Sequence, residues 1–207
     1  MSHAWRLIDT GSCSAAYNMA LDEAIAIAVR QDLSPPTLRI YGWDQRSVSI
    51  GYFQRSGDID IGYCRQNDIL IVRRPTGGRA VLHNDEITYS FSVKTRTGLF
   101  SKGLLDSDKK ISTALALALS KVGLSPQSKI HKPNPKFKIQ NSNPHNPLCF
   151  QSISYGEVSI NNTKVIGSAQ KRWADGLLQQ GSIPLTTDEN EILKLFQRNI
   201  VHVRKEP

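Results

Sequence analysis

A short turn rich in glycine and arginine joins two strand-like runs of this chain. The runs are residues 68–72 and 86–93, and the turn between them contains Arg73, Arg74, Gly77, Gly78 and Arg79. Glycine reaches positive φ without steric cost and lets a backbone approach a ligand closely, whereas arginine binds carboxylate and phosphate groups. The turn therefore predicts either a pocket at a sheet edge for an acidic or phosphorylated ligand, or an ordinary turn with solvated arginines. His83, just after the turn, is expected either to contact a ligand or to cap the strand.

Length and composition predict a single globular domain over residues 1–207. A chain of this length can bury a full core, and 39% of its residues are hydrophobic. Its apolar helical stretches are too short for a membrane span, and its N-terminus lacks the apolar core of a signal peptide. Its three cysteines, Cys13, Cys64 and Cys149, are too widely spaced for a zinc site and fit a reducing compartment. We therefore expect a cytoplasmic protein without membrane contact and without a bound metal.

The net charge of +8 is unevenly distributed along the sequence. Between Asp108 and Glu157 the chain has seven lysines and no acidic residue. A surface of one sign attracts acidic partners, so nucleic acid, an acidic carrier protein and a merely solvated face are the three alternatives. Only Phe137 interrupts the lysines as an aromatic residue, which disfavours binding of single-stranded nucleic acid.

Hydrophobic periodicity predicts an α+β domain in which helices pack on a mixed or antiparallel sheet. The strand-like segments are residues 5–9, 37–41, 47–52, 68–72, 86–93, 152–160, 163–170 and 176–185. The helical segments are residues 15–30, 59–66, 108–122 and 188–196, with Ser14, Ser107 and Thr187 as N-caps of the first, third and fourth. Asn161-Asn162 is expected to turn a hairpin. A long loop rich in lysine, asparagine and proline is expected over about 124–147.

Two further residues are candidates for chemistry. A cysteine thiolate is a strong nucleophile when a nearby cation lowers its pKa, and Lys164 lies across the predicted hairpin from Cys149. The alternative is that Cys149 is a small buried hydrophobe and Lys164 a solvated turn residue. Asn18 and Asp22 share one helix face, where a structural polar contact is expected. No P-loop, dinucleotide fingerprint or HExxH metal motif is present.

Seven segments, in order along the chain, resemble the lipoyl/octanoyl attachment family, which shares its fold with biotin and lipoate–protein ligases. They are residues 18–23 (NMALDE), 38–43 (LRIYGW), 49–54 (SIGYFQ), 73–83 (RRPTGGRAVLH), 149–150 (CF), 164–172 (KVIGSAQKR) and 177–183 (LLQQGSI). The turn sequence Pro-Thr-Gly-Gly-Arg and the position of Cys149 are most similar to the cysteine-dependent octanoyltransferases of the Bacillus type. ATP-dependent ligases typically have a third glycine where this chain has Arg79, and usually carry a C-terminal accessory domain, which we do not expect here.

The resemblance implies transfer of an octanoyl or lipoyl group from acyl carrier protein to a lysine of a lipoyl domain or of a glycine-cleavage-H-type protein. It implies Cys149 as the nucleophile, Lys164 as its partner, and no cofactor. It also implies a substrate site formed by Arg73, Gly77, Gly78, Arg79, His83, Gly167, Ser168 and Ala169, in which the glycine turn lines a tunnel for the acyl chain.

Two alternatives stay open at this point. An ATP-dependent lipoate–protein ligase would use the same pocket with ATP and Mg²⁺ to form an acyl-adenylate, and Cys149 would then be incidental. A non-catalytic binder of a carrier protein or nucleic acid on the same fold is the third hypothesis, although the presence of both Cys149 and Lys164 disfavours it and nucleic acid is not the expected partner.

Overall fold

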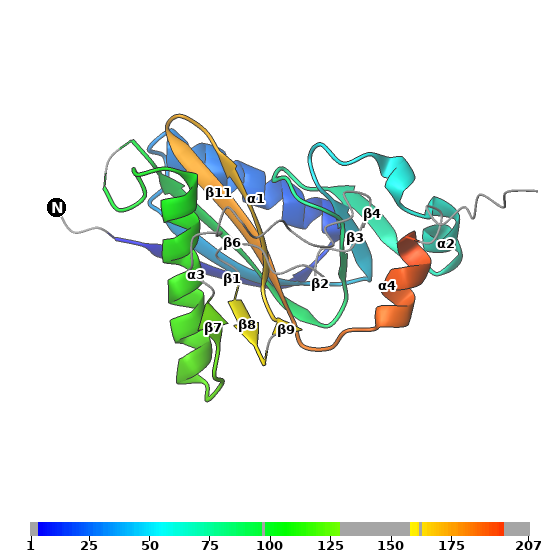
Figure 1. Ribbon diagram of the computed structural model, residues 1–207. Helices are drawn as coiled ribbons and strands as arrows, with labels where there is room; N and C mark the ends of the chain where they lie inside the picture. The colour runs from blue at the N-terminus through cyan, green and yellow to red at the C-terminus, as the bar shows by residue number, and fades with distance from the viewer. Residues whose placement is uncertain (1–3, 97, 129–157, 162, 197–207) are drawn as a thin grey trace, which may run out of the picture.

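The computed structural model describes residues 4–96, 98–128, 158–161 and 163–196, and it is an α+β fold built on a mixed sheet (Figure 1). In this part of the chain the main sheet contains, side by side, β1 (Arg6–Cys13), β2 (Thr37–Trp43), β6 (Glu86–Lys94), β11 (Gly176–Pro184) and β10 (Gly167–Arg172). β1 runs parallel to β2, and the other neighbours are antiparallel. The predicted fold class is thus confirmed.

A second sheet carries the turn that contains the glycine pair. Its strands are β3 (Ser47–Ile50), β4 (Leu70–Arg73) and β5 (Val81–His83), with β3 in the centre. Because β4 and β5 flank β3, the turn that connects them passes over the end of β3, and the Arg74 N–H donates to the Ile50 carbonyl at 3.0 Å. The described residues also form a small antiparallel sheet of β7 (Gln127–Ser128), β8 (Val158–Ile160) and β9 (Thr163–Lys164).

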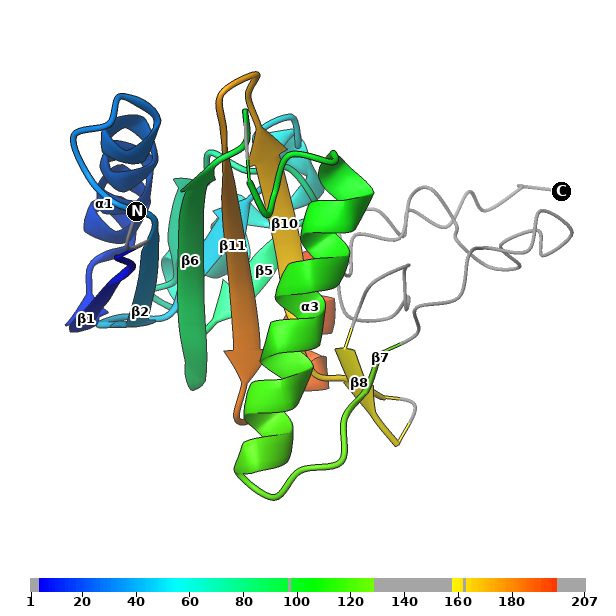
Figure 2. The ribbon, with the colours of Figure 1, turned by 90° about the vertical axis from the view of Figure 1, so that its left-hand side faces the viewer.

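The two faces of the main sheet differ in polarity because side chains alternate along a strand. On β6 the aromatic and aliphatic residues at 89, 91 and 93 point to one face, and the hydroxyl residues at 88, 90 and 92 point to the other; all six are buried. The apolar face packs against α3 (Leu104–Lys121) through Ile111. The polar face lies under α1 (Ala15–Arg30), and Figure 2 shows the two helices on either side of the strands. The polar face is where a site can form.

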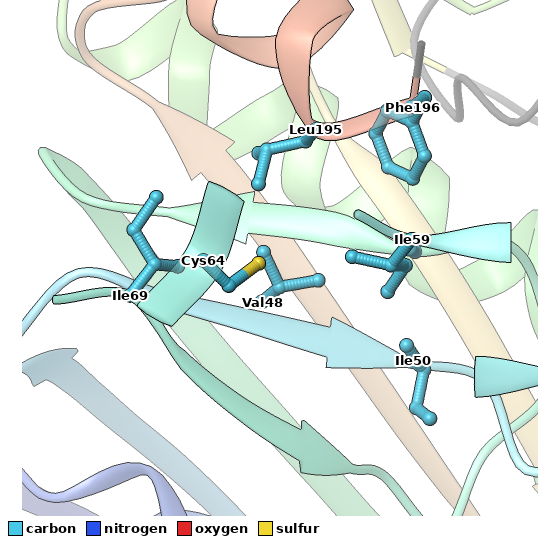
Figure 3. Packing of buried hydrophobic residues seen from close by; sticks show 8 residues of the cluster. Val48, Ile50, Ile59, Cys64, Ile69, Leu195 and Phe196 are labelled. Carbon is cyan, nitrogen blue, oxygen red and sulfur yellow. The ribbon is translucent and has the colours of Figure 1, made fainter. Parts of the chain in front are cut away.

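A separate hydrophobic cluster fills the space beside the second sheet (Figure 3). Val48 and Ile50 from β3 pack there with Cys64 from α2 (Ile61–Gln66). Two further members come from other elements: Ile59 follows the short helix η1 (Ser56–Asp58), and Leu195 lies in α4 (Glu189–Phe196). The Asp60 N–H donates to the Leu195 carbonyl at 2.8 Å, and Arg46 forms an ion pair of 2.6 Å with Glu191. The final described helix thereby completes the core around β3.

Local capping signals predicted one helix start and missed two. Ser14 caps α1, and its side chain accepts from the Tyr17 N–H as expected. Ser107 is not a cap: α3 begins one turn earlier, at Leu104, and the buried Ser107 hydroxyl donates to the Gly103 carbonyl inside the first turn. Asp188, rather than Thr187, accepts from the N–H groups of residues 190 and 191 at the start of α4. A carboxylate at this position satisfies the exposed N–H groups and interacts well with the helix dipole.

Strand boundaries differ more from the prediction. β1 extends to Cys13, the run over 68–72 is shifted to β4 (Leu70–Arg73), and β5 was not predicted as a strand.

The predicted hairpin is present where Asn161, with φ 49, separates β8 from β9, but β10 begins separately at Gly167. Of the predicted loop, residues 127 and 128 form β7, and residues 129–147 lie outside the described part. None of the helices in the described part of the chain is long and apolar enough to cross a membrane.

Candidate functional site

The glycine turn has a conformation that requires glycine at one of its two glycine positions. Gly78 has φ +86, and a Cβ atom there would lie 2.9 Å from Arg74 Nη2, whereas a Cβ atom at Gly77 would meet nothing within 4 Å. The preceding turn packs directly on it, because a Cβ atom at Gly51 would lie only 1.9 Å from the Gly78 carbonyl oxygen. The two turns therefore approach each other by backbone contact, which glycine at both positions permits.

Arginine side chains hold these turns in place. Arg73 Nη1 donates to the carbonyls of residues 51, 52 and 54 at 2.7–2.9 Å. The buried Arg74 guanidinium donates to the Ser49 carbonyl and hydroxyl and to the carbonyls of Gly77 and Arg79. Five N–H donors in a planar fork suit such multiple contacts. These hydrogen bonds of Arg73 and Arg74 go to backbone and hydroxyl oxygens that shape the turns.

A pocket opens between the two sheets, next to Gly78. It encloses about 430 Å³ of space, part of which is open solvent. Its lining comes from α1, both sheets and the turn: Met19, Tyr41, Trp43, Ser49, Arg74, Gly78, Val81, His83, Thr88, Gly167, Ser168, Ala169, Gln180, Gly181 and Ser182. The accessible surface of this lining is mostly apolar. Such a pocket suits an apolar ligand whose few polar groups are placed by hydrogen bonds.

The pocket brings together five of the predicted binding residues, Gly78, His83, Gly167, Ser168 and Ala169. Arg73, Gly77, Arg79 and Lys164 do not belong to its lining. Sequence reasoning missed the aromatic residues at 41 and 43 and the hydroxyl residues at 49, 88 and 182. Arg74 belonged to the predicted turn but not to the predicted substrate site. Residues 41, 43, 49 and 182 lie inside segments that carry the family resemblance, so those segments contained a usable signal.

A buried polar network anchors the turn from below. Asp22 accepts hydrogen bonds from Arg39 Nη1, Tyr41 OH, Ser90 Oγ and Gln180 Nε2 at 2.6–2.8 Å. The Gln180 carbonyl oxygen then accepts from the Thr76 hydroxyl, at the turn itself, at 2.8 Å. The expected structural role of Asp22 is confirmed. Burial and the Asp22 carboxylate raise the pKa of Tyr41 well above its ordinary value, so Tyr41 is a neutral donor.

Comparison with known proteins identifies the family. Residues 14–206 match the family model described as lipoyl protein ligase A/B catalytic domain. The chain belongs to this family. It is 41% identical to octanoyltransferase LipM of Kyrpidia tusciae, over 93% of this chain and 70% of that protein. It is 37% identical to octanoyltransferase LipM of Bacillus subtilis, over 93% of this chain and 69% of that protein.

The fold is also similar to that of a T. acidophilum protein solved with bound lipoic acid. The TM-score is 0.73 at 22% identity, and the match covers 93% of this chain and 73% of that chain. Together with the family match, these relatives confirm the resemblance drawn from the seven segments and the predicted enzyme class, an octanoyltransferase.

Of the two predicted catalytic residues of this lipoyl protein ligase A/B domain, the structure describes one, Lys164. Lys164 ends β9, is 7% exposed, and pairs with Ser159 across the hairpin. Cys149 lies outside the described residues, so its predicted proximity to Lys164 stays a prediction. Cys64 is buried in the cluster around β3, and burial raises the pKa of its thiol. The described residues contain no group of three side chains suited to a metal ion.

The two glycines of the turn are expected to respond differently to substitution. Gly78→Ala should lower the free energy of unfolding by about 1–2 kcal/mol, because an L-residue is strained at positive φ and the added Cβ atom would press on Arg74. Gly77→Ala, with open space around the added atom, should change it by less than about 0.5 kcal/mol. Urea denaturation of both variants measures the difference, and equal losses would contradict the structure of the turn.

Proposed function

We propose that this chain is the octanoyltransferase of a lipoate assembly pathway, moving an octanoyl group from acyl carrier protein to a lysine of a lipoyl domain or a glycine-cleavage-H-type protein. Two observations together carry the proposal. Octanoyltransferases are similar to this chain over most of its length, and an apolar-lined pocket lies beside the glycine turn. A saturated eight-carbon chain is the kind of ligand that such a lining favours.

The proposed reaction proceeds through a thioester on Cys149. Its thiolate attacks the carbonyl carbon of the carrier thioester, a C–S bond to Cys149 forms, the C–S bond to the carrier breaks, and the carrier leaves as a thiolate. The amine of the acceptor lysine then attacks the new thioester, an amide forms, and the Cys149 thiol is regenerated. Both steps exchange one acyl bond for another of equal or lower energy, so the proposal needs neither ATP nor Mg²⁺. Lys164 would favour the thiolate by its charge and accept a proton from the incoming amine when neutral.

Charge supports acidic protein partners for this reaction. The net charge is +8, and all seven charged residues between Asp108 and Glu157 are lysines. An excess of positive charge accelerates encounter with acidic domains and makes the rate sensitive to salt. The proposal places the reaction in the cytoplasm, since a reactive thiol persists best in a reducing compartment.

The proposal is tested by intact-mass spectrometry after incubation with octanoyl-loaded carrier protein in the absence of ATP. We expect a mass increase of one octanoyl group that hydroxylamine removes, and no such adduct on Cys149→Ala. Cys13→Ala serves as a matched control, because Cys13 lies at the end of β1 and outside the pocket lining, and it should keep the adduct. A folded wild-type protein without an adduct, which instead forms an acyl-adenylate from ATP and lipoate, would favour the ligase and contradict the proposal.

A further inference from the structure

A buried carboxylate, Glu86, lies directly behind the pocket lining. It is the first residue of β6, its side chain is 2% exposed, and it is not itself a lining residue. Four lining side chains donate to it: His83 Nδ1 at 2.7 Å, Ser182 Oγ at 2.8 Å, Trp43 Nε1 at 3.1 Å, and Thr88 Oγ1. The Trp43 N–H is shared, because it also donates to Thr88 Oγ1 at 2.8 Å. Glu86 is therefore a common acceptor for residues from β2, β5, β6 and β11.

The charge state of Glu86 fixes the direction of these hydrogen bonds. Burial alone would raise its pKa, but attraction by His83 and hydrogen bonds from His83, Thr88 and Ser182 lower that pKa below its ordinary value. An ionised carboxylate only accepts hydrogen bonds. Hence each of the two hydroxyls and both ring N–H groups directs a hydrogen toward Glu86, away from the space that the pocket encloses.

The same arrangement fixes the aromatic floor of the pocket. The rings of Trp43 and His83 stack with their centroids 3.9 Å apart and an angle of 13° between their planes. The other His83 nitrogen, Nε2, lies 2.7 Å from the Ser49 hydroxyl, which also accepts from Arg74 Nη1 at 3.1 Å. His83 therefore hydrogen bonds through both ring nitrogens, to Glu86 at Nδ1 and to the Ser49 hydroxyl at Nε2. Part of the pocket wall is thus polar, and its groups from residues 43, 83, 88 and 182 are already hydrogen-bonded to Glu86.

We propose that Glu86 determines the acyl specificity of this pocket by withdrawing the polar hydrogens of Trp43, His83, Thr88 and Ser182 from the ligand. The wall then accepts the saturated end of an acyl chain and rejects a chain with a hydroxyl group at that end. Removing the carboxylate leaves the buried donors of His83, Thr88 and Ser182 without this acceptor, whereas Trp43 keeps the Thr88 hydroxyl. A ligand hydroxyl then becomes a favourable partner. This inference rests on the proposed acyl transfer and adds the residue that selects the acyl group.

The test is a competition between octanoyl and 8-hydroxyoctanoyl groups on the carrier protein, read as the ratio of their kcat/KM values. The wild-type protein should prefer octanoyl by roughly 100-fold, the size of discrimination that an apolar pocket exerts against an added hydroxyl. Glu86→Ala should reduce this preference about tenfold, because unsatisfied donors bind the added hydroxyl. Glu86→Gln keeps the shape and one acceptor oxygen, so its preference should fall by a smaller factor, about threefold. Glu23→Gln, at an exposed position of α1, is the matched control and should keep the wild-type ratio.

The ratio separates specificity from stability. A variant that is merely less stable loses both rates in proportion and keeps the wild-type ratio, and that result would overturn the role of Glu86. If Glu86→Ala does not fold, an unchanged ratio in Glu86→Gln overturns it equally. A wild-type protein that transfers neither acyl group would instead refute the proposed acyl transfer, so the two failures are distinguishable.

Discussion

Asp22→Asn is expected to lower the free energy of unfolding by about 3–5 kcal/mol, the range for breaking a buried ion pair by removing one partner. The side chains of Asp22 and Arg39 are both 0% exposed and lie 2.8 Å apart. An asparagine keeps the shape but removes the charge that compensates the Arg39 guanidinium, and its NH₂ group faces donors such as Tyr41 OH and Gln180 Nε2. The loss should therefore exceed that of a typical surface substitution several-fold.

Chemical denaturation in urea measures this loss, with Glu23→Gln, the exposed neighbour on the same helix, as the control. The control should unfold within about 0.5 kcal/mol of the wild type. In the double variant Asp22→Asn/Arg39→Met the loss should be smaller than the sum of the two single losses, since the two charges stabilise each other. Additive losses, or a loss below about 1 kcal/mol in Asp22→Asn, would show that the network is not an ion pair in the folded protein.

Gly51→Ala is expected to reduce octanoyl transfer about 100-fold, the cost that a displacement of about 1 Å imposes on a positioned site. The added Cβ atom would lie 1.9 Å from the Gly78 carbonyl oxygen, 2.9 Å from the Gly78 carbonyl carbon and 3.1 Å from the Gly77 carbonyl carbon. All three atoms are backbone, so the clash is relieved only when the glycine turn moves away from the end of β3. That movement shifts Gly78 and Arg74, which both line the pocket.

Gly57→Ala is the control for this variant, because a Cβ atom at Gly57 meets nothing within 4 Å and the residue is exposed in η1. Steady-state rates of octanoyl transfer for both variants, measured alongside circular dichroism, separate displacement of the turn from global unfolding. If folded Gly51→Ala retained more than half of the wild-type rate, the contact between the two turns would not position the site.

Local sequence signals predicted the parts of this fold that depend on neighbouring residues. The cap at Ser14, the glycine turn and the hairpin at Asn161 each follow from the chemistry of a few adjacent residues. The start of α3 was missed because Ser107 looks like a cap in sequence, although the chain at Gly103, with φ 110, already begins the helix. Here a distant residue competes with the local cap, because Arg172 Nη1 of β10 donates to the buried Ser107 hydroxyl at 2.9 Å inside the first turn.

The site was harder to predict because its residues meet through the register of distant strands. Arg73 and Arg74 are adjacent in sequence, and β4 ends at Arg73. Arg74 lines the pocket, whereas Arg73 bonds to the carbonyls of the neighbouring turn. Likewise Glu86 acquires its role from Trp43 and Ser182, which are 43 and 96 residues away in the chain. A polar residue at the start of a strand carries no local sign that it will be buried with four donors.

The position of α4 has a consequence for how the chain acquires its structure during synthesis. The cluster around β3 joins residues 48 and 50 to residues 195 and 196, so its core lacks a wall until nearly 150 further residues have been made. Contacts between such distant segments form slowly because a large loop must first close. On the ribosome, the turn that shapes the pocket is therefore synthesised well before α4, which completes the cluster around β3. During that interval the apolar side of β3 lacks its cover, and exposed apolar surface of this kind favours association with other chains.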